Sequence, residues 1–168
     1  MIMSTKNLYD DKAREKIKEI AEDVDFCMLV TNMDQKPLSA IPMSTKEVDD
    51  HGAVWFLSNA NSEHNRNIEK DSDVQLLYSG TSDMEFLSIY GEAFIETNRD
   101  VIHELYSKAD NAWFEGKDDP NITAIKVNPK EAYYWDNDES KMTTLFKLGM
   151  AAVSGNKQDI GEKGKLEL

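Results

Sequence analysis

The chain has 168 residues, 40% of them hydrophobic and 30% charged, which allows one good core plus a tail rather than two independent cores. Its formal net charge of -13 repels nucleic-acid phosphates and anionic membranes, and no apolar run approaches the roughly 20 residues that span a bilayer. We therefore expect a cytoplasmic protein with no nucleic-acid and no membrane partner, and the single Cys27 excludes an internal disulfide framework.

The first predicted element is an amphipathic helix from Asp10 to Val24 that covers one end of the core. Its apolar positions recur at three- and four-residue steps among charged residues, namely Ala13, Ile17, Ile20, Ala21 and Val24. The period then changes, because Phe26 to Thr31 is a continuous apolar run and turn-prone residues lead from it into Leu38 to Ser44. This pattern predicts a β-hairpin.

The middle of the chain predicts a strand at Val54 to Ser58, a helix from Ser62 to about Lys70, and two further strands. These strands, Val74 to Ser79 and Phe86 to Glu96, are separated by turn residues and are expected to pair antiparallel. Gly91 in the second of them permits a bulge or a close backbone approach, as small barrels need where a strand bends.

A second helical pattern covers Arg99 to Ser107, and Trp113 and Phe114 follow it in a polar loop. Ile122 to Val127 and Ala132 to Trp135 then predict two closing strands, separated by a turn at Asn128-Pro129-Lys130. About seven short strands with interrupting helices are typical of a small antiparallel barrel rather than of a doubly wound sheet.

The end of the chain predicts a helix over residues 139–153, with Gly155 near its C-cap, and a short edge strand from Gly161 to Leu168. The predicted organisation is thus a barrel domain with its N-terminal helix over residues 1–138, and a C-terminal helix and short tail over residues 139–168 that pack on the same domain.

The turn between Ser58 and Ser62 is a candidate phosphate site. A strand that turns into a helix there presents unpaired backbone N–H groups and the positive end of a helix dipole. The side chains of Asn59 and Ser62 add donors, while Arg66 and Lys70 lie one and two turns further along the same face. Asn and Ser also cap such turns for purely structural reasons, so both interpretations stay open.

Several stretches together resemble the pyridoxamine 5'-phosphate oxidase-like FMN-binding split barrels, especially the bacterial general stress proteins. The similar stretches span nearly the whole chain: Val54 to Asn59, Ser62 to Ile68, Val74 to Tyr78, Ile41-Pro42-Met43, Trp113-Phe114, Tyr134-Trp135-Asp136 and Ile160 to Lys165. The resemblance implies a mainly β fold with peripheral α-helices, a six- to seven-stranded antiparallel split β-barrel with flanking helices. It also implies a homodimer with two flavin mononucleotides (FMN) at the interface, each touched by both subunits.

Carried over position by position, the resemblance assigns cofactor-binding roles. Ser62 and His64 occupy the positions that bind the phosphate in the family, and Arg66 is a cation that can contribute to phosphate binding. The ribityl chain and the flavin ring are expected along two strand segments, which contribute Leu57, Ser58, Ile41, Pro42, Met43 and Ser44. Trp113, Phe114 and Trp135 are expected near the dimer interface, where aromatic side chains cover a flat ring.

The chain departs from the family pattern at three of these positions. His64 replaces the phosphate-binding lysine, Glu63 replaces a neighbour that is often basic, and Ile41 replaces an arginine. The lost cationic contacts predict weaker flavin binding, because a charge-assisted hydrogen bond contributes about 1.5 to 3 kcal/mol. The substrate-binding arginine and histidine of the oxidase itself have no counterpart, which argues against pyridoxamine phosphate oxidation.

No other group stands out as a site. His51 and His103 lack a second ligand at metal spacing, so no metal is expected, and Cys27 is expected to be a buried, inert thiol. Catalytic residues stay unknown. An FMN-dependent oxidoreductase with an unknown substrate, a non-catalytic carrier of flavin or another planar cofactor such as haem, and a dimer that has lost its cofactor all remain open.

Overall fold

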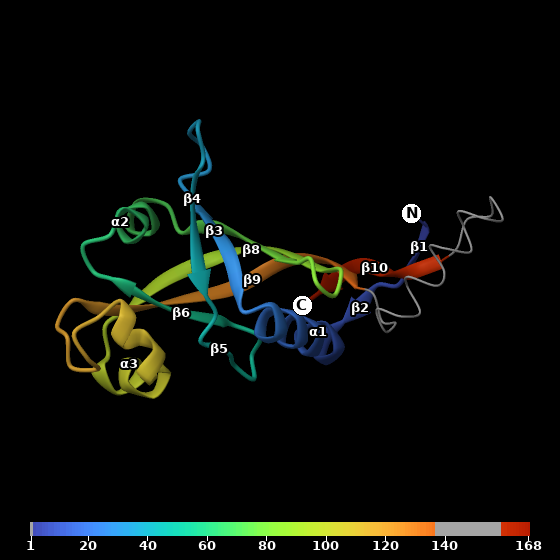
Figure 1. Ribbon diagram of the computed structural model, residues 1–168. Helices are drawn as coiled ribbons and strands as arrows, with labels where there is room; N and C mark the ends of the chain where they lie inside the picture. Colours follow the sequence, from blue (N-terminus) through green and yellow to red (C-terminus); the bar gives the residue numbers. More distant parts are fainter. Residues whose placement is uncertain (1, 137–158) are drawn as a thin grey trace.

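The computed structural model describes residues 2–136 and 159–168, which form one curved sheet with helices around it (Figure 1). The strands of this ten-stranded sheet are β1 (Ile2–Thr5), β2 (Leu8–Tyr9), β3 (Phe26–Thr31), β4 (Ser39–Ser44), β5 (Glu47–Val48), β6 (Val54–Asn59), β7 (Asp73–Gly80), β8 (Glu85–Glu96), β9 (Ile122–Asp136) and β10 (Asp159–Glu167). The helices are α1 (Asp10–Val24), α2 (Glu63–Lys70), α3 (Arg99–Leu105) and the 3₁₀ helix η1 (Lys108–Ala112).

The sheet curls into an open barrel. Its strand order is β1-β10-β9-β8-β7-β3-β4. Strand β6 pairs with the first half of β9, residues 122–127, whereas β10 pairs with the last part, residues 132–136. The strand pairs β4–β3, β3–β7, β7–β8, β8–β9 and β9–β6 are all antiparallel. No ladder joins β4 to β6, so the barrel is split between these two strands. The predicted mainly β split barrel with peripheral helices is confirmed.

Strand β9 corrects the expected pair of closing strands, because residues 122–136 form one continuous strand without a turn at Asn128-Pro129-Lys130. The sheet absorbs the proline at a register shift, where Tyr90 pairs with Glu131 but Gly91 pairs with Pro129. A proline lacks the N–H that a regular ladder needs and is tolerated at such a bulge. A Cβ on Gly91 would collide with the carbonyl oxygen of Asn128, so the predicted bulge and close approach at this glycine are both confirmed.

Helix α1 agrees in its bounds with the predicted helix and packs against the sheet. Its four buried side chains, Ala13, Ile17, Ile20 and Ala21, join a core cluster formed with β3, β6, β7, β8 and β9. Each fully buried isoleucine contributes about 1.5 to 3 kcal/mol. Helix α3 packs on the other end of the barrel through a smaller cluster with Leu57, Ile122 and Ala124.

Strand β10 confirms the predicted terminal strand but not its edge position. It lies between β9, with which it pairs antiparallel, and β1 and β2, which pair with it in parallel. The backbone of β10 lies very close to the connection between β1 and β2, because a Cβ on Gly164 would collide with the carbonyl oxygen of Lys6. Tyr134 donates a hydrogen bond of 2.7 Å to the same oxygen. The helix predicted over residues 139–153 lies outside the described residues, so the division at residue 138 stays a prediction.

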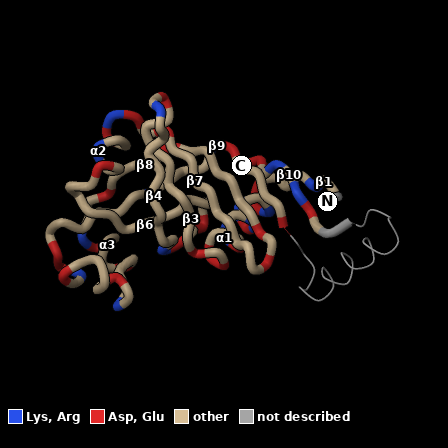
Figure 2. The backbone as a smooth tube through the Cα atoms, turned by 45° about the horizontal axis from the view of Figure 1, so that its top comes forward, with Lys and Arg blue, Asp and Glu red and all other residues tan. Residues whose placement is uncertain are grey.

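Charged residues gather on the helices, turns and strand ends, while the central strands are largely uncharged (Figure 2). Among the described residues, no helix has the length and apolar character that crossing a membrane requires.

Candidate functional site

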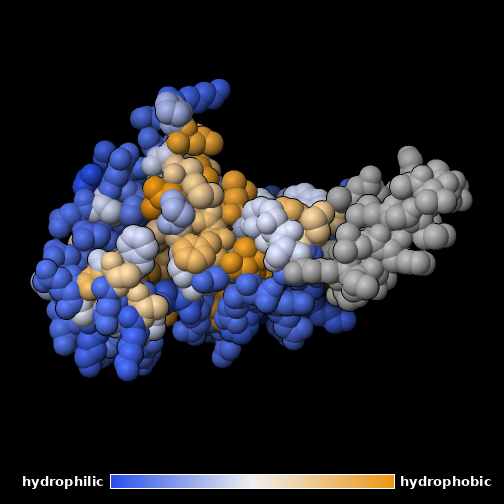
Figure 3. All heavy atoms as spheres, viewed as in Figure 1, coloured by the Kyte–Doolittle hydropathy of each residue, from blue (hydrophilic) through white to orange (hydrophobic). Residues whose placement is uncertain are grey.

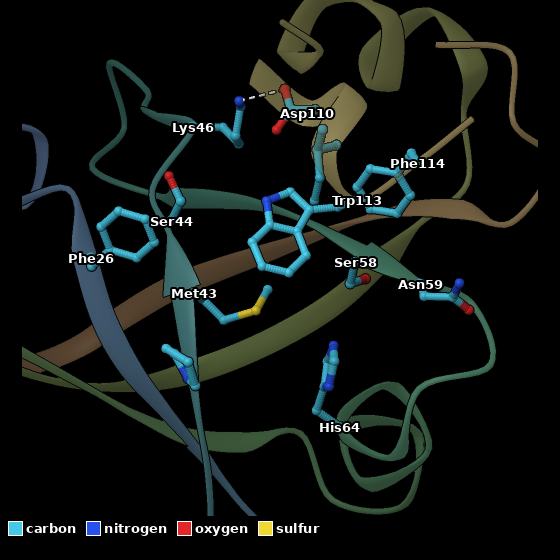
Figure 4. Close-up of a pocket in the computed structure, with 12 residues that line it drawn as sticks. Phe26, Met43, Ser44, Lys46, Ser58, Asn59, His64, Asp110, Trp113 and Phe114 are labelled. Carbon is cyan, nitrogen blue, oxygen red and sulfur yellow. Dashed lines mark hydrogen bonds and ion pairs between the residues drawn. The ribbon is translucent and has the colours of Figure 1, made fainter. Parts of the chain in front are cut away.

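A pocket of about 270 Å³ lies at the split between β4 and β6 (Figure 4). Because β4 is the last strand on its side of the sheet, one of its edges is unpaired, and three consecutive residues, Pro42, Met43 and Ser44, line one wall of the pocket. Leu57, Ser58 and Asn59 at the end of β6 line another. The remaining lining residues come from the start of β3, the β4–β5 connection, α2, and the segment around η1: Phe26, Lys46, His64, Asp110, Trp113 and Phe114.

His64 forms the end of the pocket that faces α2. Ser62 caps this helix, its Oγ accepting a hydrogen bond of 3.2 Å from the backbone N–H of Asn65, and so directs the first turn toward the pocket. The Nε2 atom of His64 is buried and has no hydrogen-bond partner among the described residues. Burial lowers the pKa of His64 below its ordinary value of 6.5, although Glu63 acts in the opposite direction. A buried ring nitrogen without a partner is therefore available to a ligand.

A buried hydrogen-bond network fixes this end of the pocket. The hydroxyl groups of Ser58 and Thr123 share a hydrogen bond of 2.7 Å between β6 and β9. Asn65 donates from Nδ2 to Thr123 Oγ1 at 2.8 Å, which ties α2 to the same pair. Ser58 is 3% exposed, so this network sets its position on the pocket wall.

Lys46 and Asp110 form the opposite end of the pocket (Figure 4). Lys46 Nζ lies 2.7 Å from Asp110 Oδ2, and the two side chains are only 13% and 12% exposed. Burial by itself raises the pKa of Asp110, but hydrogen bonds from Lys46 and Ser107 outweigh it and hold the pKa below its ordinary value. The pair therefore connects the β4–β5 segment to η1 as a carboxylate–ammonium contact.

Aromatic side chains surround the space between these two polar ends. Trp113 is 81% exposed and Phe26 is 58% exposed, and both line the pocket. Phe114 packs against the core cluster around α3 and presents its other side to the pocket. The pocket thus has apolar walls suited to a flat ring, with hydrogen-bonding groups at both ends.

Most of the residues predicted to bind a cofactor come together in this pocket: Pro42, Met43, Ser44, Leu57, Ser58, His64, Trp113 and Phe114. They come from four separate segments of the chain, so the fold brings together positions that are distant in the sequence.

The other four predicted residues lie outside the pocket lining. Ile41 packs against the main core, and Ser62 serves as the N-cap of α2. Arg66 donates from its guanidinium to the carbonyl oxygen of Asn61. Trp135 lies on β9 beside a second hollow of about 460 Å³, whose lining also includes Tyr133, Lys163 and Lys165.

Three pocket residues were missed by the sequence analysis: Phe26, Lys46 and Asp110. Lys46 follows the predicted ring-facing strand by two residues, which is a weak local signal. Asp110 belongs to a capping box with Ser107, a pattern that indicates a helix start and not a ligand site.

Two further predictions concern metal and thiol chemistry. Within the described residues, no three His, Cys, Asp or Glu side chains form a group that could hold a metal ion. Cys27 is buried, and burial raises the pKa of its thiol to about 12, which keeps the unreactive thiol form at neutral pH.

Comparisons with known proteins agree with this fold. A family model described as pyridoxamine 5'-phosphate oxidase like matches residues 12–159. No curated protein sequence matches the chain.

Solved structures of similar fold include three bacterial proteins. A protein of the general stress protein 26 type from Jannaschia sp. CCS1 is 23% identical with a TM-score of 0.76, and the match covers 94% of this chain and 99% of that one. General stress protein 26 from Bacillus anthracis is 24% identical with a TM-score of 0.64, covering 72% and 92%. A general stress FMN/FAD binding protein from Xanthomonas citri is 23% identical with a TM-score of 0.66, covering 78% and 93%.

Proposed function

Because the chain belongs to the pyridoxamine 5'-phosphate oxidase-like family, we propose that it binds flavin mononucleotide in the pocket between β4 and β6. The observation that carries this proposal is the unpartnered, buried Nε2 of His64 at one end of an aromatic-walled pocket. The similar Xanthomonas citri protein is described as FMN/FAD binding, which supports the same class of ligand.

The donor set of the pocket fits a phosphate at one end and a flat ring in the middle. His64 would hold the phosphate together with Asn59, and Ser58 would lie next to the ribityl chain. Met43 and Trp113 would contact the flavin ring, since they line the same pocket. A neutral imidazole donates one hydrogen bond where a lysine ammonium donates up to three, so we expect weaker phosphate binding than a lysine gives.

We also propose that two copies of the chain complete the site. At about 270 Å³, the pocket lies just below the usual 300 to 1,000 Å³ of small-molecule pockets, so a second surface is needed to enclose a nucleotide. A row of outward-facing residues crosses the sheet from β4 to β9 through Pro42, Met28, Leu77, Ser88 and Tyr133.

This row is largely apolar, with Met28, Leu77 and Tyr133 each about 40% exposed. Figure 3 shows hydrophobic side chains gathered over this part of the molecule. Isologous packing of this face in a homodimer buries these side chains and brings Trp135 of each subunit toward the partner's pocket.

For the bound state we propose oxidoreductase activity on a substrate still to be identified. A bound flavin supplies hydride or electron transfer between a donor such as a reduced nicotinamide and an acceptor. The protein binds and orients this group through His64, Met43 and Trp113 and excludes water from it. A non-catalytic flavin carrier is the second candidate, favoured by Lys46 and Asp110 being engaged with each other rather than free for proton transfer.

The test begins with the visible absorption spectrum of protein purified without added cofactor, followed by titration with FMN. We expect saturable binding, seen as quenching of flavin fluorescence. A colourless protein that also fails to bind added FMN contradicts the proposal. If FMN binds, anaerobic mixing with reduced nicotinamide separates the two candidates, since an oxidoreductase bleaches the flavin and a carrier leaves it oxidised.

A further inference from the structure

The Lys46–Asp110 end of the pocket carries an inference about how a ligand is recognised. Asp110 Oδ2 accepts three hydrogen bonds: from Lys46 Nζ at 2.7 Å, from the Ser107 backbone N–H at 2.7 Å and from Ser107 Oγ at 2.8 Å. Asp110 Oδ1 accepts none from the part of the chain that the structure describes. An ionised carboxylate has acceptor sites on both oxygens, so Oδ1 keeps its full capacity.

Lys46 leaves a donor beside this acceptor. Its ammonium group has three N–H bonds, and two of them are directed to Asp110 Oδ2 and, at 3.3 Å, to Ser107 Oγ. Within the described residues the third has no acceptor. Both side chains line the pocket, at the end away from His64 (Figure 4). One donor and one acceptor are thus presented side by side.

We propose that Lys46 and Asp110 recognise an amide or imide edge of the ligand, with Lys46 donating to a carbonyl oxygen and Asp110 Oδ1 accepting from the adjacent N–H. The inference rests on the proposed function and deepens it. In a flavin such an edge belongs to the pyrimidine part of the ring, where N3–H lies between two carbonyl groups. The pyrimidine part therefore lies toward η1 and the phosphate toward α2.

This arrangement also discriminates among planar cofactors. Haem has no N–H beside a carbonyl at its edge, and its carboxylates would be repelled by Asp110, which favours flavin over haem. A site whose buried polar groups are left unpaired by an analogue rejects that analogue strongly. The two side chains are thus specificity-determining residues.

The test compares FMN with N3-methyl-FMN, which lacks the N–H but keeps both carbonyl groups. We expect wild-type protein to bind FMN about tenfold to a hundredfold more tightly than N3-methyl-FMN, measured by quenching of flavin fluorescence. Lys46→Met is expected to lower the affinity for both flavins while preserving the preference for FMN, because Asp110 still accepts from N3–H.

Asp110→Asn is the decisive variant. Three donors converge on Oδ2, so the amide oxygen is expected to take that position and the amide NH₂ to replace Oδ1 in the pocket. This exchange turns the acceptor into a donor while the cap of η1 stays in place. We expect the preference for FMN to fall to about onefold, with the melting temperature recorded to confirm folding. Lys108→Met, an exposed neighbour on η1, serves as the control and keeps the preference.

The outcomes separate the inference from the proposed function. Equal affinity of the wild type for the two flavins overturns the inference and leaves FMN binding intact. The inference is equally overturned if Asp110→Asn weakens both flavins by the same factor, which is what a purely structural role produces. If the wild type binds neither flavin, the proposed function fails and the inference fails with it.

Discussion

Ser58 and Thr123 share a buried hydrogen bond of 2.7 Å between hydroxyl groups that are 65 residues apart in the chain. Asn65, which is 2% exposed, donates to the same Thr123 oxygen from α2. One oxygen atom thus holds β6, β9 and α2 in register, and the end of the pocket occupied by His64 depends on it.

Thr123→Val tests this role. The substitution keeps the shape of the side chain but removes the oxygen, which leaves the Nδ2 of Asn65 buried without a partner. An unsatisfied buried donor costs about 1 to 3 kcal/mol, so we expect that loss of stability in urea-induced unfolding. Thr123→Ser keeps the oxygen and is expected to lose less. If the two variants are equally stable, the network does not hold α2 in place.

The charge state of His64 predicts a pH dependence of flavin binding. Burial lowers the pKa of His64 below 6.5 in the free protein, whereas a bound phosphate favours the imidazolium and raises it. Binding therefore takes up a proton between the two pKa values, and affinity for FMN falls as pH rises through that window.

The matched control for His64 is His64→Gln, which keeps a donor but cannot titrate. Because the phosphate of FMN itself titrates near pH 6, the expected result is the difference between wild type and His64→Gln across pH 5 to 8. Parallel curves would contradict a contact between His64 and the phosphate. His64→Lys is expected to tighten FMN about tenfold at pH 8, where its charge persists.

Glu85 predicts a pH dependence of stability. It lies at the start of β8, where burial, followed by the nearby charges of Asp136, Asp23 and Glu19, raises its pKa from 4.5 to about 7. The folded state thus binds a proton that the unfolded state releases between these values. The contribution of Glu85 to stability is therefore lost as pH rises from about 4.5 to about 7.

Glu85→Gln removes this titration. Allowing for solvent screening of a half-exposed group, we expect the variant to gain about 1 kcal/mol over the wild type at pH 8 and to match it near pH 4. Urea unfolding at the two pH values measures the difference. Glu131→Gln, at an exposed position on β9, is the control and is expected to change little at either pH. A constant offset at all pH values would contradict the assignment to Glu85.

The apolar sheet face predicts the oligomeric state. Leu77→Glu places a charge in the middle of the row that includes Met28 and Tyr133, and burial of an unpaired charge is costly. We expect light scattering to show a dimer for the wild type and a monomer for Leu77→Glu. His51→Glu, in an exposed turn, carries the same charge change and is expected to stay dimeric. A monomeric wild type would refute the proposed dimer.

Trp113 separates ligand binding from folding. Since its side chain is 81% exposed, Trp113→Ala is expected to change stability by no more than about 0.5 kcal/mol. Loss of an aromatic ring contact is nevertheless expected to weaken FMN about twofold to tenfold. Tyr9→Ala, another exposed aromatic position, is the control for stability and binding. Unchanged FMN affinity in Trp113→Ala would place the ring elsewhere.

Local patterns in the sequence were sufficient to predict most of the helices and strands. The three- and four-residue spacing in α1, the apolar run of β3 and the Ser62 cap of α2 each predict structure from neighbouring residues, and each is confirmed. Local patterns failed at Pro129, where turn-forming residues lie in a continuous strand. The bulge lies in β9 itself, where the register skips Lys130 between the pairs Tyr90–Glu131 and Gly91–Pro129. Gly91, which is distant in sequence, has no side chain to block the close approach of Asn128 there.

The sequence by itself therefore determined the strand segments that border the pocket, because spacing and turn chemistry act over a few residues, and its resemblance to a family of split barrels indicated how these strands are arranged. Only the tertiary structure decided which side chains meet there. Lys46 and Asp110 lie 64 residues apart, and no local pattern relates them until β6, β9 and α3 bring η1 against the β4–β5 segment. Burial between those elements then joins the two charges and leaves one donor and one acceptor facing the pocket.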